Sequence, residues 1–156
     1  EVWNESQLPV SMRFRPYMPS GNMGIRRDAF DALGGFDESL VLGQEDVDLG
    51  WRATALGLDI VHAPEARVDY YQRKGLCRHL RQRFRYGLAH VQLYLKHQDE
   101  PIEVASITTS LRWFVEWGKQ FPGAVREQEA GQRVGELAFQ VARCLESARQ
   151  RVRTPL

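Results

Sequence analysis

The sequence predicts an α/β fold in the first half of the chain and an all-helical second half. Up to about residue 72, short apolar segments alternate with glycines and prolines, which is typical of strands and short helices joined by turns. Beyond residue 73, apolar residues recur every three or four positions over long stretches, which predicts amphipathic helices. We therefore expect two regions, residues 1–72 and residues 73–156.

The elements of the first region follow from local signals. Proline and glycine mark its turns, and acidic residues at the start of a helix are favoured by the helix dipole. We expect Gly34 and Gly57 to end helices, because glycine adopts the left-handed conformation of a helix C-terminus. In chain order we expect an irregular stretch at 1–19, a strand end close to a ligand at 20–25, helices at 26–33 and 44–56, and strands at 59–64 and 66–71.

The second region shows three helical patterns. The first covers residues 75–97, with apolar positions from Leu76 to Leu95. The second is expected to open at Pro101 and to be broken by Pro122 and Gly123. The third covers residues 125–151. Trp113, Trp117 and Phe121 share one face of the second helix, which favours a helix–helix contact over a sugar-binding platform.

Charge is unevenly distributed, although the net charge is only +1. Ten acidic residues lie between Asp28 and Asp69, whereas residues 73–85 contain six Lys or Arg and no acid. This indicates a basic face that meets an anionic partner. A nucleic-acid partner is not expected, since few aromatic residues interleave the basic run, the net charge is near zero and no nucleic-acid motif is present.

The compartment is expected to be the cytoplasm. The two cysteines, Cys77 and Cys144, lie far apart and lack metal-ligand spacing, which favours free thiols in a reducing environment. No apolar run approaches the length that crosses a bilayer, and we expect no signal peptide. The basic run adds peripheral contact with the cytoplasmic membrane face as an alternative.

The residues most able to carry chemistry form an acidic cluster after a Gly-Gly turn. The turn reads Gly34-Gly35-Phe36-Asp37-Glu38, and seven residues later the chain reads Glu45-Asp46-Val47-Asp48. Repulsion among three carboxylates in four residues favours one that takes up a proton and acts as a base. The alternative is a helix N-terminus that merely carries acids, with Asp48 and Arg52 forming an ion pair one turn apart.

These motifs resemble the second half of the inverting glycosyltransferases of family 2, which have the GT-A fold, a Rossmann-like α/β domain. The resemblance covers about residues 19–95 and implies that Asp46 is the general base that deprotonates an acceptor hydroxyl. It implies acceptor binding by Glu45, and Arg52, at the basic position that often follows, is expected to be a further substrate-binding residue. It also implies that Gly21, Asn22 and Met23 line the sugar-donor site, as an alternative to a strand packed closely in the core.

The chain departs from the family pattern in two places. The sequence before Ser20 does not predict the parallel strands of a nucleotide-binding half, so Asp46-Val47-Asp48 is not expected to be the metal motif that it spells. In many relatives a His that helps to hold the metal occupies the position of Tyr70, and a phenol is a poor replacement. Mn²⁺ or Mg²⁺ is therefore expected only in the complete enzyme.

The basic run resembles the Arg-rich segment that follows the acceptor site in this family. Arg81 and Arg83 are the residues that we expect to contact an anionic substrate, with a solvated basic helix face as the alternative. The resemblance implies transfer of a sugar from a nucleotide-sugar donor to a carbohydrate, lipid-linked or protein acceptor. Two alternatives stand beside it: a non-catalytic interaction module of the same fold, and a protein that docks on membranes or polyanions through residues 73–85. Unpaired strand edges predict a homo-oligomer or pairing with an N-terminal fragment.

Overall fold

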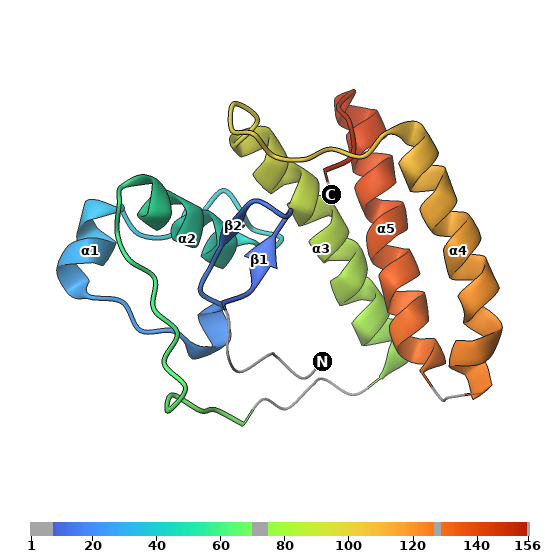
Figure 1. The fold of residues 1–156 in the computed structure, drawn as a ribbon, viewed down its shortest axis with the longest axis horizontal. Coiled ribbons are helices and arrows are strands. Elements are labelled where there is room, and N and C mark those ends of the chain that lie inside the picture. The colour runs from blue at the N-terminus through green and yellow to red at the C-terminus, as the bar shows by residue number, and fades with distance from the viewer. Residues whose placement is uncertain (1–7, 70–74, 127–128, 156) are drawn as a thin grey trace. The chain divides into compact units, whose positions relative to one another are not determined.

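The computed structural model describes residues 8–69, 75–126 and 129–155 (Figure 1). Contacts between residues divide the chain into two compact units, Glu1–Gln72 and Arg73–Leu156. The first unit holds a two-stranded hairpin and three short helical elements, and the second holds three long helices. No described helix is both long enough and apolar enough to cross a membrane.

The first unit is built around the helix that carries the acidic motif. It contains, in order, strand β1 (Val10–Ser11), strand β2 (Arg15–Pro16), the 3-10 turn η1 (Ser20–Asn22), helix α1 (Arg27–Ala32) and helix α2 (Glu45–Ala55). The strands are antiparallel, and Arg15 accepts a hydrogen bond from the indole of Trp51, 3.2 Å away. Trp51 is fully buried and meets Phe14 edge-on, so α2 is anchored to the hairpin.

A small apolar core joins α1 to α2. Leu33, Leu49 and Ala53 form its centre, and partly buried apolar side chains surround it, namely Met23, Ile25, Phe30 and Leu58. These half-buried side chains shield the core from water. The two helices are too short to be stable alone, so packing against each other stabilises them.

Both helices end in the hydrogen-bond pattern that glycine permits. After α1, Gly34 has a φ of 73° and its N–H bonds to the carbonyl of Asp31, while the N–H of Gly35 bonds to the carbonyl of Phe30. After α2, Gly57 has the same φ and makes the equivalent bond. These paired bonds are the Schellman motif, and they confirm the predicted helix ends.

The predicted strands of the first unit are wrong. The described residues 59–69 form no strand, and residues 70–71 of the second prediction lie outside the described part. Residues 20–25 contain the turn η1 instead of a strand end. A strand is stable only when its backbone groups bond to a neighbouring strand. The described residues of this unit offer β1 and β2 alone, and these bond to each other.

The second unit consists of α3 (Leu76–Lys96), α4 (Ile107–Arg126) and α5 (Ala130–Gln150). Helix α5 lies between the other two and packs against both (Figure 1). A Cβ atom added to Gly87 of α3 would lie 2.3 Å from the carbonyl oxygen of Phe139, and one added to Gly135 of α5 would lie 2.2 Å from the His79 ring. Glycine therefore allows α3 and α5 to approach closely.

Three predicted helix boundaries are wrong in this unit. The second helix begins at Ile107 and not at Pro101, because the segment before it pairs with the C-terminal tail: Val104 forms an isolated bridge with Pro155. The helix also continues past Pro122 to Arg126, so the third helix begins at Ala130 and not at residue 125. Proline inside a helix removes one backbone donor and crowds the carbonyl four residues before it, a local cost that α4 tolerates near its end.

Candidate active site

The Asp46 carboxylate is held in place by two backbone N–H groups. The N–H of Ser20 donates to Oδ2 at 2.9 Å, and the N–H of Val47 donates to Oδ1 at 2.8 Å. Before it, Gln44 has a φ of 75°, so the chain turns sharply into the first residue of α2. Asp46 is only partly buried, and a carboxylate accepts up to about four hydrogen bonds. It can therefore accept a further bond from a hydroxyl group.

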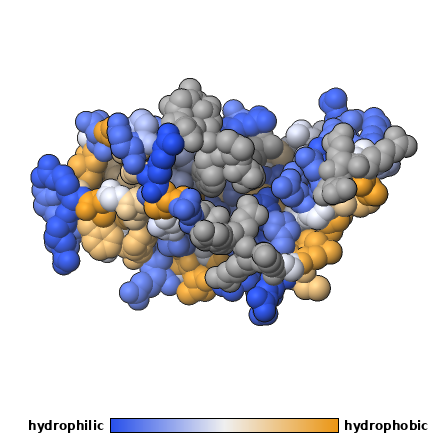
Figure 2. All heavy atoms as spheres, turned by 90° about the horizontal axis from the view of Figure 1, so that it is seen from below, coloured by the Kyte–Doolittle hydropathy of each residue, from blue (hydrophilic) through white to orange (hydrophobic). Residues whose placement is uncertain are grey.

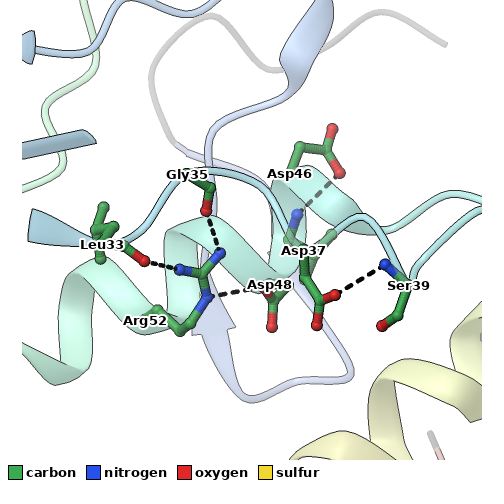
Figure 3. Close-up of polar contacts among 8 residues, drawn as sticks. Leu33, Gly35, Asp37, Ser39, Asp46, Asp48 and Arg52 are labelled. Carbon is green, nitrogen blue, oxygen red and sulfur yellow. Dashed lines mark hydrogen bonds and ion pairs between the residues drawn. The ribbon is translucent and has the colours of Figure 1, made fainter. Parts of the chain in front are cut away.

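Asp48 lies two residues further along α2 and has a different environment. Its side chain is fully buried, and Oδ2 accepts a hydrogen bond from Nε of Arg52 at 2.8 Å. The same guanidinium donates to the carbonyl oxygens of Leu33 at 2.6 Å and Gly35 at 2.8 Å. Figure 3 shows the guanidinium between these groups, with Asp46 pointing away from them. We call Asp48, Arg52 and these two carbonyls the Arg52 clamp.

The Arg52 clamp ties the Gly-Gly turn to the helix that carries Asp46. Three N–H groups of one planar guanidinium are fixed at once, and such bonds to a charged group are stronger than neutral ones. Arg52 thus has a structural role, and the expected ion pair with Asp48 is confirmed. Its predicted contact with substrate stays a prediction.

The two carboxylates of Asp46-Val47-Asp48 have different hydrogen-bond partners, a backbone N–H for Asp46 and the Arg52 guanidinium for Asp48. In the described ranges, no group of three or more His, Cys, Asp or Glu side chains is placed to hold a metal ion. Tyr70, where many relatives have a ligand, lies outside the described residues.

The turn η1 links Asp46 to a second segment. The side-chain amide of Asn22 donates to the carbonyl of Ala66 at 2.6 Å, while the N–H of Ser20 bonds to Asp46. Gly21 is exposed and Met23 packs against the apolar core. The turn that contains Gly21 and Asn22 is thus bonded to Asp46 through Ser20, but the contact of the three expected residues with a donor stays a prediction.

The other expected site residues are placed as follows. Glu45 opens α2 and is partly buried, and its side chain makes no hydrogen bond or ion pair to another described residue. Arg81 and Arg83 lie on α3 in the second unit, where the Arg83 guanidinium lies 5.1 Å from the centre of the Phe139 ring. Lys74 and Arg73 lie outside the described residues.

Sequence reasoning missed the backbone groups that fix the site. The N–H of Ser20 and the carbonyls of Leu33 and Gly35 carry no residue-specific signal, because every residue has them. It also missed Gly50, where an added Cβ would lie 2.9 Å from Cα of Tyr17. A glycine inside an amphipathic helix is the one signal that points to such a close approach.

Comparison with known proteins identifies the family of the chain. The family model described as glycosyl transferase family group 2 matches residues 4–118, which is more than half of the chain. The chain belongs to this family. The match includes the acidic motif, the Gly-Gly turn and the segment 20–25.

Curated relatives of this family 2 chain are longer proteins. A pre-mycofactocin glycosyltransferase of Mycobacterium tuberculosis is 34% identical over 84 residues, 54% of this chain and 18% of the relative. An N-acetylglucosaminyl-diphospho-decaprenol L-rhamnosyltransferase of the same species is 34% identical over 71 residues, which are 46% of this chain and 23% of the relative. The succinoglycan biosynthesis protein ExoA of Rhizobium meliloti is 35% identical over 77 residues, which are 49% of this chain and 23% of the relative. The chain thus spans about a fifth of their length. No solved structure matches it.

Proposed function

We propose that the chain is the acceptor-side part of a glycosyltransferase that moves a sugar from a nucleotide-sugar donor to an acceptor hydroxyl with inversion. The observation that carries the proposal is the different treatment of two nearby carboxylates. Asp48 is buried under Arg52, whereas Asp46 is held by backbone donors and remains partly accessible. Family membership supplies the reaction class.

In the proposed reaction the Asp46 carboxylate accepts a hydrogen bond from the acceptor hydroxyl and then takes its proton. The hydroxyl oxygen attacks the anomeric carbon, a new C–O bond forms, and the bond to the diphosphate breaks with its electron pair on the leaving group. A single attack from the opposite face inverts the anomeric configuration. Glu45, half-buried beside Asp46, is proposed to position the acceptor through its own carboxylate.

A divalent cation would offset the charge that develops on the leaving diphosphate. Among the described side chains, no group of three or more His, Cys, Asp or Glu is placed to hold such a cation. We propose that Mn²⁺ or Mg²⁺, together with the nucleotide, is bound by other parts of the complete enzyme. The proposed acceptor is a carbohydrate or lipid-linked hydroxyl, in keeping with the similarity to an N-acetylglucosaminyl-diphospho-decaprenol L-rhamnosyltransferase and a succinoglycan biosynthesis protein.

The test is the substitution Asp46→Asn in the full-length enzyme, followed by release of nucleoside diphosphate from a panel of nucleotide sugars. Asn keeps one acceptor oxygen but takes up no proton, so we expect turnover to fall by about 10²–10⁴-fold with little change in the KM for the donor. Loss of one of the two backbone hydrogen bonds costs about 1 kcal/mol of stability.

The matched control is Asp59→Asn, the same chemical change at an exposed aspartate of the same unit. It is expected to leave turnover unchanged. If Asp46→Asn retains wild-type turnover with every donor that the wild type uses, Asp46 is not the base. If the wild type itself releases no nucleoside diphosphate from any donor, the interaction-module alternative is favoured.

A further inference from the structure

Helix α4 carries a stripe of exposed apolar side chains along its whole length. Ile107, Leu111, Val115 and Val125 are 82%, 59%, 57% and 53% exposed. With 3.6 residues per turn, all four lie within an arc of about 80° around the helix. Exposed residues Gly118 and Pro122 occupy the same arc between them, and the set runs about 27 Å. We call these six residues the α4 stripe.

The α4 stripe is separate from the face that packs on α5. On that face the indole N–H of Trp117 donates to the carbonyl of Arg133 at 2.9 Å, and the Trp117 ring stacks on Phe121 with 4.9 Å between centres. The expected aromatic contact between helices is thus confirmed. Helix α4 is therefore apolar over a wider arc than its contact with α5 uses, and none of its described residues is fully buried.

A wide apolar arc exposed to water indicates a surface that meets another apolar phase. Figure 2 shows exposed apolar side chains, in orange, over the part of the chain that holds α4 and α5. An amphipathic helix that lies in a membrane interface likewise has apolar residues on one face and cations on the other. Arg112 and Lys119 lie next to the α4 stripe, on its polar side, and Lys119 pairs with Glu116 at 2.7 Å.

The net charge of the helical unit favours an anionic partner over a second copy of the unit. Residues 73–156 contain fifteen Lys and Arg against eight Asp and Glu, a net charge of +7, whereas residues 1–72 carry six against twelve, a net charge of −6. Two copies of the helical unit that met through the α4 stripe would bring two charges of +7 together. An anionic lipid surface would instead attract the same unit, because juxtamembrane Lys and Arg are stabilised near anionic headgroups.

We propose that the helical unit docks on an anionic lipid bilayer, with the α4 stripe buried at the boundary between headgroups and acyl chains. The helix lies in the plane of the membrane surface. Basic residues of the unit face the headgroups. The membrane contact is thereby assigned to α4, whereas the sequence pattern had pointed to residues 73–85.

The test is flotation of the 156-residue chain with phosphatidylcholine vesicles and with vesicles that also contain phosphatidylglycerol. The expected result is binding to the anionic vesicles that weakens as NaCl is raised. The double substitution Leu111→Gln/Val115→Gln is expected to weaken binding by about a hundredfold or more, because two apolar side chains no longer leave water. Both positions are exposed, so the double variant is expected to fold normally. An unchanged helical circular dichroism spectrum checks this.

The matched control is Val41→Gln/Val61→Gln, at two valines of the first unit that are 72% and 79% exposed. It is expected to float like the wild type. The proposal is overturned if the wild type does not float with anionic vesicles, or if the double variant of α4 floats equally well. It is also overturned if the wild type fails to float and light scattering shows a dimer that Ile107→Gln dissociates, because the α4 stripe is then a contact between copies.

Discussion

Removal of the Arg52 guanidinium is expected to unfold much of the first unit. The substitution Arg52→Gln leaves the fully buried Asp48 carboxylate without its cation and frees the carbonyls of Leu33 and Gly35. Removing one partner of a buried ion pair costs about 3–5 kcal/mol. A small domain is stable by only about 5–15 kcal/mol, so this loss takes a large share of the total.

The ion pair between Arg27 and Asp31 provides a matched control. It has the same spacing of four residues and a similar N–O distance, 2.9 Å against 2.8 Å, but its side chains are 87% and 56% exposed. Exposed ion pairs contribute at most about 1 kcal/mol. Arg27→Gln is therefore expected to change the free energy of unfolding far less than Arg52→Gln.

Urea unfolding, followed by circular dichroism and by fluorescence of the buried Trp51, measures both effects. A double-mutant cycle with Asp48→Asn then isolates the pair, and the coupling is expected to reach about 2 kcal/mol, within the range for residues in contact. Amide exchange at Gly34 and Gly35 should also become faster in Arg52→Gln. If Arg52→Gln costs less than about 1 kcal/mol, or if the two single changes are additive, the Arg52 clamp does not hold the Gly-Gly turn.

Two further predictions concern glycines at close contacts. Gly50→Ala is expected to destabilise the first unit by about 1–3 kcal/mol, because the added Cβ would lie 2.9 Å from the backbone of the loop after β2. Gly24→Ala is the control and is not expected to destabilise the unit, because an added Cβ there would have nothing within 4 Å. The midpoints of urea unfolding measure both effects. Gly87→Ala is expected to lower the thermal midpoint by forcing α3 away from a carbonyl of α5, while Gly131→Ala, whose nearest contact would be 3.9 Å, should keep or raise it. Equal midpoints for Gly87→Ala and wild type would contradict the close packing of these helices.

The helices were predictable from sequence because their signals are local. Helix α2 was expected at 44–56 and spans Glu45–Ala55, and α3 was expected at 75–97 and spans Leu76–Lys96. Their apolar periods and terminal glycines lie within the segment itself. The strands at 59–64 and 66–71 were not predictable in this way, because a strand depends on a partner elsewhere in the chain.

The candidate site was predictable in outline only. The acidic motif placed Asp46 in the first turn of α2 and paired Asp48 with Arg52, since both features follow from helix geometry. The backbone groups that complete the site come from distant segments, such as the N–H of Ser20 on Asp46 and the carbonyl of Leu33 on Arg52. Their positions depend on the tertiary fold, which the local pattern does not specify.

The three carboxylates of the acidic motif have different environments, which explains why one helix turn can hold them all. A positive guanidinium neutralises Asp48 and commits it to the scaffold, so the remaining negative charge of the motif is concentrated on Glu45 and Asp46. The scaffold in turn fixes the direction of the Asp46 side chain through the turn η1. It follows that Asp48→Asn should lower stability and Asp46→Asn should lower turnover. A result in which each change lowered both properties equally would mean that the two carboxylates act as one unit.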